Sequence, residues 1–348
     1  MRWGARLLRS GTCLSRPAST LPAERRRSRL RSGSASSGPR PVALPKKPLN
    51  VLRLRAPAKV NLTLEVLRRR SDGYHEVATI LQAVGLWDVL ELEVAPGLTV
   101  GCDVAGLNGP DNLVMRAAEL LQAEAHTTQG AALRLTKRIP VAGGLGGGSA
   151  DAAAALVGLD RLWGLHLPGG RLSEMAASLG SDVPFFLSGG TALATGRGER
   201  IATLPALTKA YLVLLAPPLN LPRKTATLYG ALAPADFHDG AASGRVASLL
   251  ERGEQVRPEG FLNTFERVAY RVFPDLARFT EMMRSAGADW VHLAGSGPVL
   301  FCMVKERTVG REMALRLRNE GVEAWCVPTV SGGVEVAAVH REAHLAEQ

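Results

Sequence analysis

A glycine-rich stretch, RIPVAGGLGGGSADAAAAL at residues 138–156, limits the folds open to this chain more than any other segment. Five of the six residues from 143 to 148 are glycine, and a block of alanines follows soon after. The preceding AALRLTKRIP alternates apolar and polar residues as a strand does. The segment after it is rich in helix-forming residues, with Leu156, Leu159 and Trp163 on one side. The sequence therefore predicts a strand, a glycine loop and a helix in succession.

A loop of this kind can bind phosphate. It leaves several backbone N–H groups unobstructed at the positive end of a helix dipole. The common templates do not fit: no Lys follows these glycines as a Walker loop requires, and a GxGxxG pattern starting at Gly144 would need glycine where the chain has Ser149. A glycine-rich turn used only for packing is the alternative. The density of glycine and the helix start favour phosphate binding.

The net charge of +10 does not indicate a nucleic-acid-binding domain. Residues 1–50 hold ten Arg and two Lys against one acid, so the rest of the chain carries a net charge of −1. Capture of nucleic acid needs a basic face on the folded domain. We expect residues 1–48, rich in Arg, Ser and Pro, to form a disordered leader. A transit peptide, a nucleic-acid-binding arm and a chain start placed too far upstream are alternatives for this leader.

The cysteines and the apolar runs indicate a reduced compartment and no membrane span. The four cysteines, Cys13, Cys102, Cys302 and Cys326, form no CxxC pair, and we expect Cys302 and Cys326 to be small core residues. No uninterrupted apolar run reaches the roughly 18 residues of a transmembrane helix. A bacterial cytoplasmic protein is the simpler interpretation, with a plastid location as the alternative if the leader is a transit peptide.

The sequence as a whole predicts an α+β protein with two halves. Alternating residues predict strands in VLRLRAPAKVNLTLEVLRR, ATILQAV and WDVLELEVA, and NLVMRAAELLQAEA predicts a helix. SEMAASLG predicts a short helix, VPFFLSGGTALATGRGE predicts two strands joined at Gly189-Gly190, and AYLVLLAPP predicts a buried strand. A helix-rich stretch, a strand-like WVHLAGSGPVLFCMV and a last helix–strand pair follow. We place a domain boundary near residues 200–208, which gives domains at 49–207 and 208–340.

The segment PVAGGLGGGSADAA resembles the central nucleotide-binding motif of the GHMP kinases, the superfamily of galactokinase, homoserine kinase and mevalonate kinase. The resemblance implies a two-domain fold, with an N-terminal ribosomal protein S5 domain 2-like unit and a C-terminal ferredoxin-like α/β sandwich. It also implies ATP as co-substrate together with Mg²⁺, with Ser149 as the loop side chain nearest the metal. The residues that it implies for ATP binding are Pro140, Val141, Ala142, Gly143, Gly144, Leu145, Gly146, Gly147, Gly148, Ser149 and Ala150.

Two further segments resemble one branch of this superfamily, the 4-diphosphocytidyl-2-C-methyl-D-erythritol kinases of the non-mevalonate isoprenoid pathway. They are APAKVNLTLEVLRRRSDGYHE, which contains Lys59, and SLGSDVPFFLSGG, which contains Asp182 and has Ser181 where the family has Ala. Alone, Lys59 would be a surface residue and Asp182 a turn residue. The resemblance implies that they form a catalytic pair. Asp182 would take the proton of the substrate hydroxyl or orient it, and Lys59 would keep Asp182 ionised.

The DGYH segment carries the substrate assignment. An aromatic ring beside an imidazole can stack on a nucleobase and bind it by hydrogen bonds, although a DG turn is more often a plain hairpin tip. The resemblance implies that Tyr74 and His75 contact the cytosine of the substrate, that Asn61 lies in the same site, and that Tyr229 supplies a second aromatic ring. The chain departs from the family at Lys224, which precedes Thr225 where the family usually has Ser-Thr.

A third segment, LAGSGPVLF at 293–301, resembles the last GHMP motif, and FLNTFERVA, with Asn263 and Glu266, resembles the segment before it. The three motifs occur in the expected order over roughly residues 50–340. We expect a small-molecule kinase that has neither nucleic acid nor a membrane as a partner. The alternatives are another GHMP kinase, of the mevalonate or homoserine type, and a non-catalytic protein of this fold whose leader contacts RNA. The presence of both Lys59 and Asp182 favours an enzyme.

Overall fold

Two long antiparallel strands, β1 (Asn50–Arg69) and β2 (His75–Ala95), form the centre of the larger sheet. The computed structural model describes residues 50–207, 209–219 and 222–341, so the predicted leader at 1–48 lies outside the described residues. The prediction of β1 is confirmed. The two strands expected at ATILQAV and WDVLELEVA are parts of the single strand β2, because the register shift beside Pro57 accommodates Gly85 and Leu86 without ending the ladder.

Six further strands complete this sheet, which divides along β2. The end of β2 pairs with β4 and the start of β2 pairs with β5, while β12 and β8 pair with the first and second halves of β1. Because β8 and β12 come from the last third of the chain, this part of the sequence contributes to the N-terminal sheet. The six strands are β3 (Leu98–Cys102), β4 (Gly130–Thr136), β5 (Thr191–Gly196), β6 (Arg200–Leu204), β8 (Leu262–Asn263) and β12 (Glu335–Arg341).

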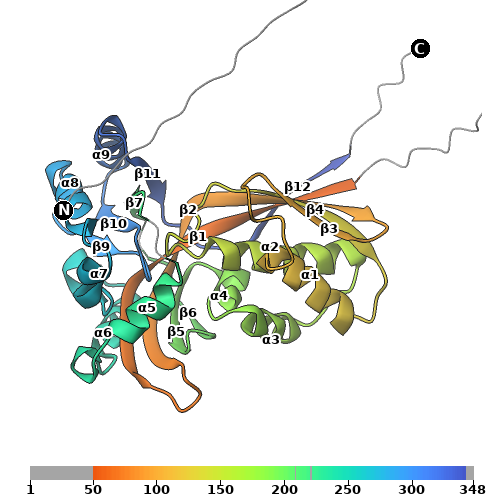
Figure 1. Ribbon diagram of the computed structural model, residues 1–348, viewed down its shortest axis with the longest axis horizontal. Helices are drawn as coiled ribbons and strands as arrows, with labels where there is room; N and C mark the ends of the chain where they lie inside the picture. The colour runs from red at the N-terminus through yellow and green to blue at the C-terminus, as the bar shows by residue number, and fades with distance from the viewer. Residues whose placement is uncertain (1–49, 208, 220–221, 342–348) are drawn as a thin grey trace, which may run out of the picture. The chain divides into compact units, whose positions relative to one another are not determined.

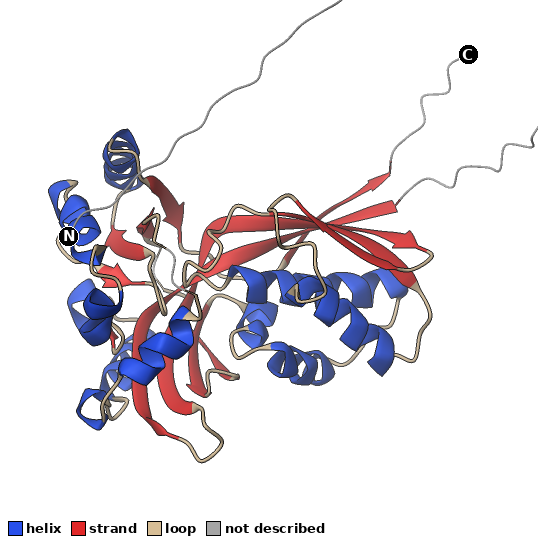
Figure 2. Ribbon diagram, in the orientation of Figure 1, coloured by secondary structure: helices blue, strands red, loops and turns tan. Residues whose placement is uncertain are grey.

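Four helices cover one face of this sheet, as Figures 1 and 2 show. The central one, α2, carries the alanine block, and Ala150 and Ala152 to Ala155 are all buried. A Cβ atom added at Gly158 would lie 2.9 Å from Leu54 and Leu92 of the sheet, so this glycine lets α2 pack closely. The helices are α1 (Leu113–Glu124), α2 (Gly147–Trp163), α3 (Gly169–Leu179) and α4 (Val183–Ser188).

One sequence prediction in this region is wrong. VPFFLS, expected to be a strand, forms the helix α4, and only the second half of that segment forms a strand, β5. Pro184 lies in the first helical turn, where its missing N–H leaves no hydrogen bond unmade. Phe185 and Phe186 are fully buried under the sheet. A short apolar run has the same pattern in a buried strand and in a buried helix, so packing decides between them.

The second sheet has the order β11-β7-β10-β9 and packs with α7, α8 and α9 in a core to which Leu64, Val66 and Val77 of the first sheet also contribute. Cys302 is buried in this core as expected, and Cys326 is partly buried against it. None of the helices in the described part of the chain is long and apolar enough to cross a membrane. The elements are β7 (Tyr211–Ala216), α5 (Lys224–Ala231), α6 (Ala241–Glu251), α7 (Glu266–Val272), α8 (Leu276–Ser285), β9 (His292–Leu293), β10 (Leu300–Val304), α9 (Arg307–Asn319) and β11 (Glu323–Pro328).

A buried carboxylate joins the first sheet to α6, and its removal should destabilise the fold. Glu65 on β1 accepts hydrogen bonds from the backbone N–H groups of Ala242 (3.3 Å) and Ser243 (2.7 Å). Glu65→Ala leaves both donors buried without an acceptor, so we expect the free energy of unfolding to fall by about 3 kcal/mol. Denaturant unfolding measures it. The control is Glu91→Ala on β2, which removes a half-exposed ion pair with Arg53 of β1. It should lower the free energy of unfolding by less than about 1 kcal/mol. Equal losses in the two variants would contradict this role.

Candidate active site

The glycine loop packs so closely against its surroundings that side chains are excluded at several positions. Gly144 has φ +89°, and a Cβ atom there would overlap the carbonyl oxygen of Ala294. Gly146 has φ +73°, and a Cβ atom there would lie 2.7 Å from the Phe186 ring and 3.0 Å from the Lys59 side chain. Only glycine combines a positive φ with no side chain. The loop therefore brings its backbone to the start of α2 with no side chain in between, as the sequence predicts.

Two cavities meet at this loop. The first, of about 700 Å³, is lined by residues 140–149, so it contains every predicted ATP-binding residue except Ala150, which is buried in α2. The second, of about 840 Å³, is lined by the predicted catalytic and substrate residues. We name them the donor cavity and the acceptor cavity. The residues that line both, and so mark their boundary, are Gly144, Gly146, Ser149, Thr225, Ala226 and Ser296.

Lys59 and Asp182 face each other in the acceptor cavity. The Lys59 Nζ atom lies 3.3 Å from Asp182 Oδ2 and donates a hydrogen bond of 2.7 Å to Asn61 Oδ1. The Lys59 side chain is buried, whereas Asp182 is partly exposed and does not use its carboxylate to cap α4. The Asn61 amide in turn donates to the Thr79 hydroxyl at 2.8 Å. Asn61 lines the cavity as expected, and its amide also fixes the position of the lysine.

The glycine loop and Lys59 are connected through the backbone. The N–H of Lys59 donates to the carbonyl oxygen of Leu145 at 2.9 Å, so β1 is attached to the loop at the residue that bears the ammonium group. The sequence could not show this contact, because the two residues are far apart in the chain and belong to different motifs.

Aromatic rings from distant segments meet in the acceptor cavity. The rings of His75 and Tyr229 stack with their centroids 4.6 Å apart and their planes at 16°. Burial, followed by the charge of Arg69, lowers the pKa of His75, so its imidazole is neutral near pH 7. Burial and then the nearby Asp182 raise the pKa of Tyr229 to about 12. The structure thus brings Tyr229 next to the DGYH turn, and both rings are uncharged at neutral pH.

Tyr74 lies at the exposed side of the same cavity, with 53% of its surface accessible. The guanidinium group of Arg197 lies 4.7 Å from the centre of its ring, which is a cation–π geometry. Sequence reasoning missed Arg197, which lies in a turn between β5 and β6 and matches no motif. Its place in the cavity depends on the pairing of β5 with β2, which no local pattern reveals.

Asn263 and Glu266 support the third motif instead of entering a cavity. The Asn263 amide donates to the carbonyl oxygens of Leu293 (2.9 Å) and Gly295 (2.8 Å), and the Glu266 carboxylate accepts from the backbone N–H of Leu293 at 2.8 Å. These bonds hold the loop at 294–297 against the glycine loop. The sequence indicated these residues only through the resemblance of FLNTFERVA to the segment that precedes the last GHMP motif.

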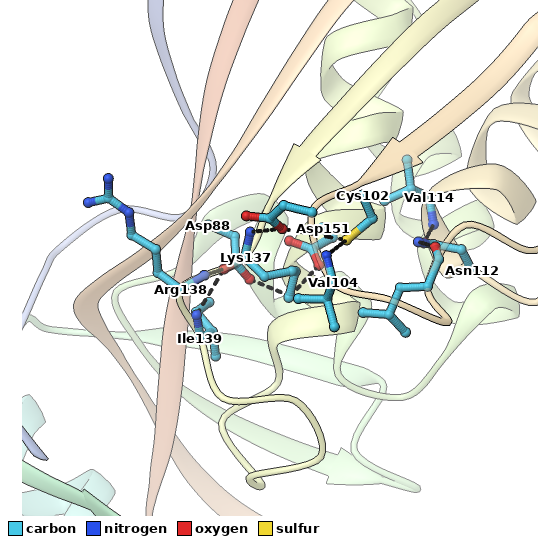
Figure 3. A network of polar contacts seen from close by, with 11 residues as sticks. Asp88, Cys102, Val104, Asn112, Val114, Lys137, Arg138, Ile139 and Asp151 are labelled. Atoms are coloured by element: carbon cyan, nitrogen blue, oxygen red, sulfur yellow. Dashed lines mark hydrogen bonds and ion pairs between the residues drawn. The ribbon is translucent and has the colours of Figure 1, made fainter. Parts of the chain in front are cut away.

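A buried network of charges lies beside the glycine loop, and sequence reasoning missed two of its three members (Figure 3). Lys137 Nζ lies 2.5 Å from Asp88 Oδ2 and 2.6 Å from Asp151 Oδ2. The other Asp88 oxygen accepts the backbone N–H groups of Arg138 and Ile139, at the entry to the loop. The network therefore joins β2, the loop and α2. Asp88 and Lys137 lie in no motif that the sequence analysis used.

The network holds more acid than base, and this shifts its pKa values. Burial, only partly offset by Lys137 and reinforced by Asp88, raises the pKa of Asp151 to about 8. Burial opposes the charge of Lys137, but the two aspartates outweigh it and raise the pKa of the ammonium group. A charged Lys137 paired with Asp88 beside a protonated Asp151 satisfies both shifts. The Oδ1 atom of Asp151 is buried without a hydrogen-bond partner among the described residues.

Lys224 lines the donor cavity at the start of α5 and is 9% exposed. Its ammonium group donates to the Ser296 hydroxyl at 2.9 Å and to the carbonyl oxygen of Gly297. Thr225 reaches the same hydroxyl at 3.0 Å. The departure from the Ser-Thr pattern was the only sequence signal for this residue.

Comparison with known proteins supports one family. The family profile described as "GHMP kinases N terminal domain" matches residues 112–190, and "GHMP kinases C terminal" matches residues 245–323. A 4-diphosphocytidyl-2-C-methyl-D-erythritol kinase from Dehalococcoides mccartyi is 42% identical over 281 residues, which are 80% of this chain and 99% of that protein. An enzyme of the same name from Pelotomaculum thermopropionicum is 43% identical, over 76% of this chain and 93% of its own length.

Solved structures agree with these relatives. A crystal structure of 4-(cytidine 5'-diphospho)-2C-methyl-D-erythritol kinase superposes with a TM-score of 0.70 and 37% identity, covering 81% of this chain and all of that one. Homoserine kinase from Cytophaga hutchinsonii shares the fold at 16% identity and a TM-score of 0.63, with 83% and 98% of the two chains covered. The predicted α+β, GHMP kinase fold is confirmed.

The charge network predicts a pH-dependent stability that one substitution should reduce. The pKa of Asp151 in the folded protein, about 8, lies above its ordinary value of 3.8, so between these values the folded state binds more protons than the unfolded state. The contribution of Asp151 to stability therefore falls as the pH rises from about 4 to 8. Asp151→Asn removes this proton, and we expect a smaller loss of unfolding free energy between pH 5 and pH 8. Denaturant unfolding in EDTA at the two pH values measures this difference.

The control for this substitution is Asp275→Asn, which changes an exposed aspartate in the same way. It should leave the difference between the two pH values as it is in the unsubstituted protein. A pH dependence that Asp151→Asn also leaves unchanged would show that this carboxyl group is already ionised in the folded protein at pH 5.

Proposed function

The chain belongs to the GHMP kinase family, and we propose that it transfers the γ-phosphoryl group of ATP to the 2-hydroxyl group of 4-diphosphocytidyl-2-C-methyl-D-erythritol. The relatives that share about 40% identity over most of the chain carry the name of that kinase. In the reaction, the bond between the γ-phosphorus and ADP breaks, a bond from the substrate oxygen to phosphorus forms, and the hydroxyl proton is released. ATP is thus the co-substrate of a step in isoprenoid precursor synthesis.

The donor cavity suits the triphosphate of ATP. The loop at 143–148 presents its backbone at the start of α2, a helix of 17 residues whose dipole favours negative charge at that end. The one side chain in this loop, that of Leu145, is buried, so no side chain of the loop keeps a phosphate away from its backbone. Phosphoryl transfer depends mainly on such positioning and on charge stabilisation. The loop therefore holds the donor.

The Lys59–Asp182 pair is placed to activate the acceptor. Asp182 lines the acceptor cavity, and its carboxylate makes no capping hydrogen bond to α4. The carboxylate can therefore accept or orient the proton of the substrate hydroxyl. Lys59 lies 3.3 Å away, so its ammonium group can support negative charge at the transferred group. Asn61 holds the lysine in this place through its 2.7 Å hydrogen bond.

The rings of the acceptor cavity suit a pyrimidine nucleotide. Tyr74, His75 and Tyr229 offer aromatic faces for stacking, and a neutral imidazole carries one donor and one acceptor nitrogen for a base edge. Arg69 and Arg197 line the same cavity and supply positive charge for a diphosphate. Neither mevalonate nor homoserine carries a base that would occupy these rings.

Mg²⁺ fits a site in which phosphates supply most of its ligands. Among the described residues, no group of three or more His, Cys, Asp or Glu side chains is placed to hold a metal ion by itself. Mg²⁺ commonly binds through one or two protein oxygens, substrate phosphates and water. The Ser149 hydroxyl, at the boundary of the two cavities, is the protein oxygen that we propose for it. Asp151 is held by Lys137 and is not assigned as a ligand. When bound, the ion would neutralise charge on the phosphates.

The observation that carries this proposal is that the Lys59–Asp182 pair and the His75–Tyr229 stack line the same cavity. An assay of ADP formation with three candidate acceptors tests it. We expect turnover with 4-diphosphocytidyl-2-C-methyl-D-erythritol and a kcat/KM at least roughly a hundredfold lower with mevalonate or homoserine, since neither fills the aromatic part of the site. Absence of turnover with the cytidyl substrate, or a preference for one of the others, would refute the assignment.

Asp182→Asn should stop phosphoryl transfer without disturbing nucleotide binding. The amide keeps the shape of the carboxylate but cannot accept the hydroxyl proton, so we expect kcat to fall by roughly 10²–10⁴. The dissociation constant of ATP, measured by calorimetry, should change less than about threefold because the donor cavity does not include Asp182. The control Asp239→Asn, which lies in neither cavity lining, should keep full activity. Unchanged turnover in Asp182→Asn would rule out this role.

A further inference from the structure

Lys224 is a buried cation for which the proposed mechanism so far has no use. Among the residues that the structure describes, no carboxylate pairs with it, and its hydrogen bonds go to the uncharged oxygens of Ser296 and Gly297. It also lies in the first turn of α5, where the helix dipole disfavours positive charge. Burying an uncompensated charge in this way costs free energy. Such a position needs an explanation other than stability.

The other lysine in the donor cavity shows the contrast. Lys137 lines the same cavity, but Asp88 and Asp151 lie within 2.6 Å of its ammonium group, and the Asp88 carboxylate neutralises it. Lys137 therefore has no charge left for a ligand. Lys224 has no acidic partner among the described residues, so an anion entering the cavity would be the first counter-ion of its charged form.

The place of Lys224 indicates which part of the nucleotide it would meet. Its partner Ser296 and its neighbour Thr225 both line the donor cavity and the acceptor cavity. Lys59 is near enough for its charge to act on Lys224. Gly295, which precedes Ser296, lies beside the Lys59 ammonium group, since a Cβ atom added at Gly295 would be 3.2 Å from Lys59 Nζ. The group that passes between the two cavities is the terminal phosphoryl group.

We propose that Lys224 binds the γ-phosphate of the nucleotide and is, beside Lys59, a second cation at the transferred phosphoryl group. This inference rests on the proposed kinase function but not on the identity of the acceptor. A lysine at this point would neutralise charge that develops during transfer. It occupies the position at which the family usually has a small hydroxyl residue, so the assignment concerns this chain.

The electrostatics of the cavity agree with this role. Burial, followed by the charge of Lys59, lowers the pKa of Lys224 to about 7. Lys59 is itself paired with Asp182, and the loop at 294–297 presents no ionisable side chain to Lys224. A phosphate beside Lys224 would favour its charged form, so binding of a triphosphate near pH 7.5 should take up part of a proton. The other ionisable side chains that line the donor cavity are Asp111, Lys137, Asp151 and Arg223.

The test compares two nucleotides in the absence of any acceptor. Lys224→Gln keeps a side chain able to bond to Ser296 but removes the charge. With Mg²⁺ present, we expect it to weaken binding of adenosine 5′-(β,γ-imido)triphosphate by about tenfold or more, and that of ADP by less than about threefold. Calorimetry in buffers of different ionisation enthalpy should show proton uptake with the triphosphate analogue in the unsubstituted protein and less in the variant.

Two controls separate this role from a structural one. Lys305→Met, an exposed lysine after β10, should bind both nucleotides normally. The melting temperature of Lys224→Gln should be equal or higher, because a buried charge is removed. Equal weakening of ADP and the analogue, or unchanged binding of the analogue, would overturn the inference. Failure of the unsubstituted protein to bind either nucleotide would instead overturn the kinase function itself.

Discussion

The contact between two loops of small residues is the constraint on which the rest of the site depends. At Gly144 the glycine loop lies against the carbonyl of Ala294 with no space for a Cβ atom, and the N–H of Val299 donates to the carbonyl oxygen of Gly143 at 3.2 Å. This approach joins the glycine loop to a segment about 150 residues later. A side chain at Gly144 would separate the two loops and open the boundary between the donor and acceptor cavities. The glycine content of the loop is thus required for packing, and phosphate binding by the same loop stays a prediction.

Three lysines around these loops show how one residue type is given different properties by its neighbours. Lys137 lies between two aspartates, so its charge serves to fix the entry of the loop and the start of α2. Lys59 shares its charge with Asp182 and is oriented by Asn61, which suits a group that must act on a reacting centre. Lys224 has uncharged oxygens as partners and a pKa lowered to about 7. An incoming triphosphate would find the second and third of these charges available and the first already neutralised.

The sequence predicted the parts of this site that depend on local patterns. The strand, loop and helix around Gly144 follow from residue type and periodicity, and the family resemblance identified Lys59 and Asp182, which the structure places 3.3 Å apart. The catalytic and binding roles of these residues stay predictions. What sequence reasoning missed depends on contacts between distant segments. The helix α4 has the apolar pattern of a strand, and its identity is decided by the burial of Phe185 and Phe186. Asp88 and Arg197 reach the site through strand pairing, so no local pattern marks them.

The helix α5 contributes residues to both cavities. Its first residue, Lys224, lines the donor cavity, and five residues later Tyr229 stacks on His75 in the acceptor cavity. Five residues along a helix rotate the side chain by about 140° beyond one full turn, so Lys224 and Tyr229 project from different sides of α5. The helix is only eight residues long and is bonded at its start to Ser296, so any shift of Lys224 toward a phosphate would also move the Tyr229 ring. One short element therefore lines both cavities, so a change in its position would alter both at once.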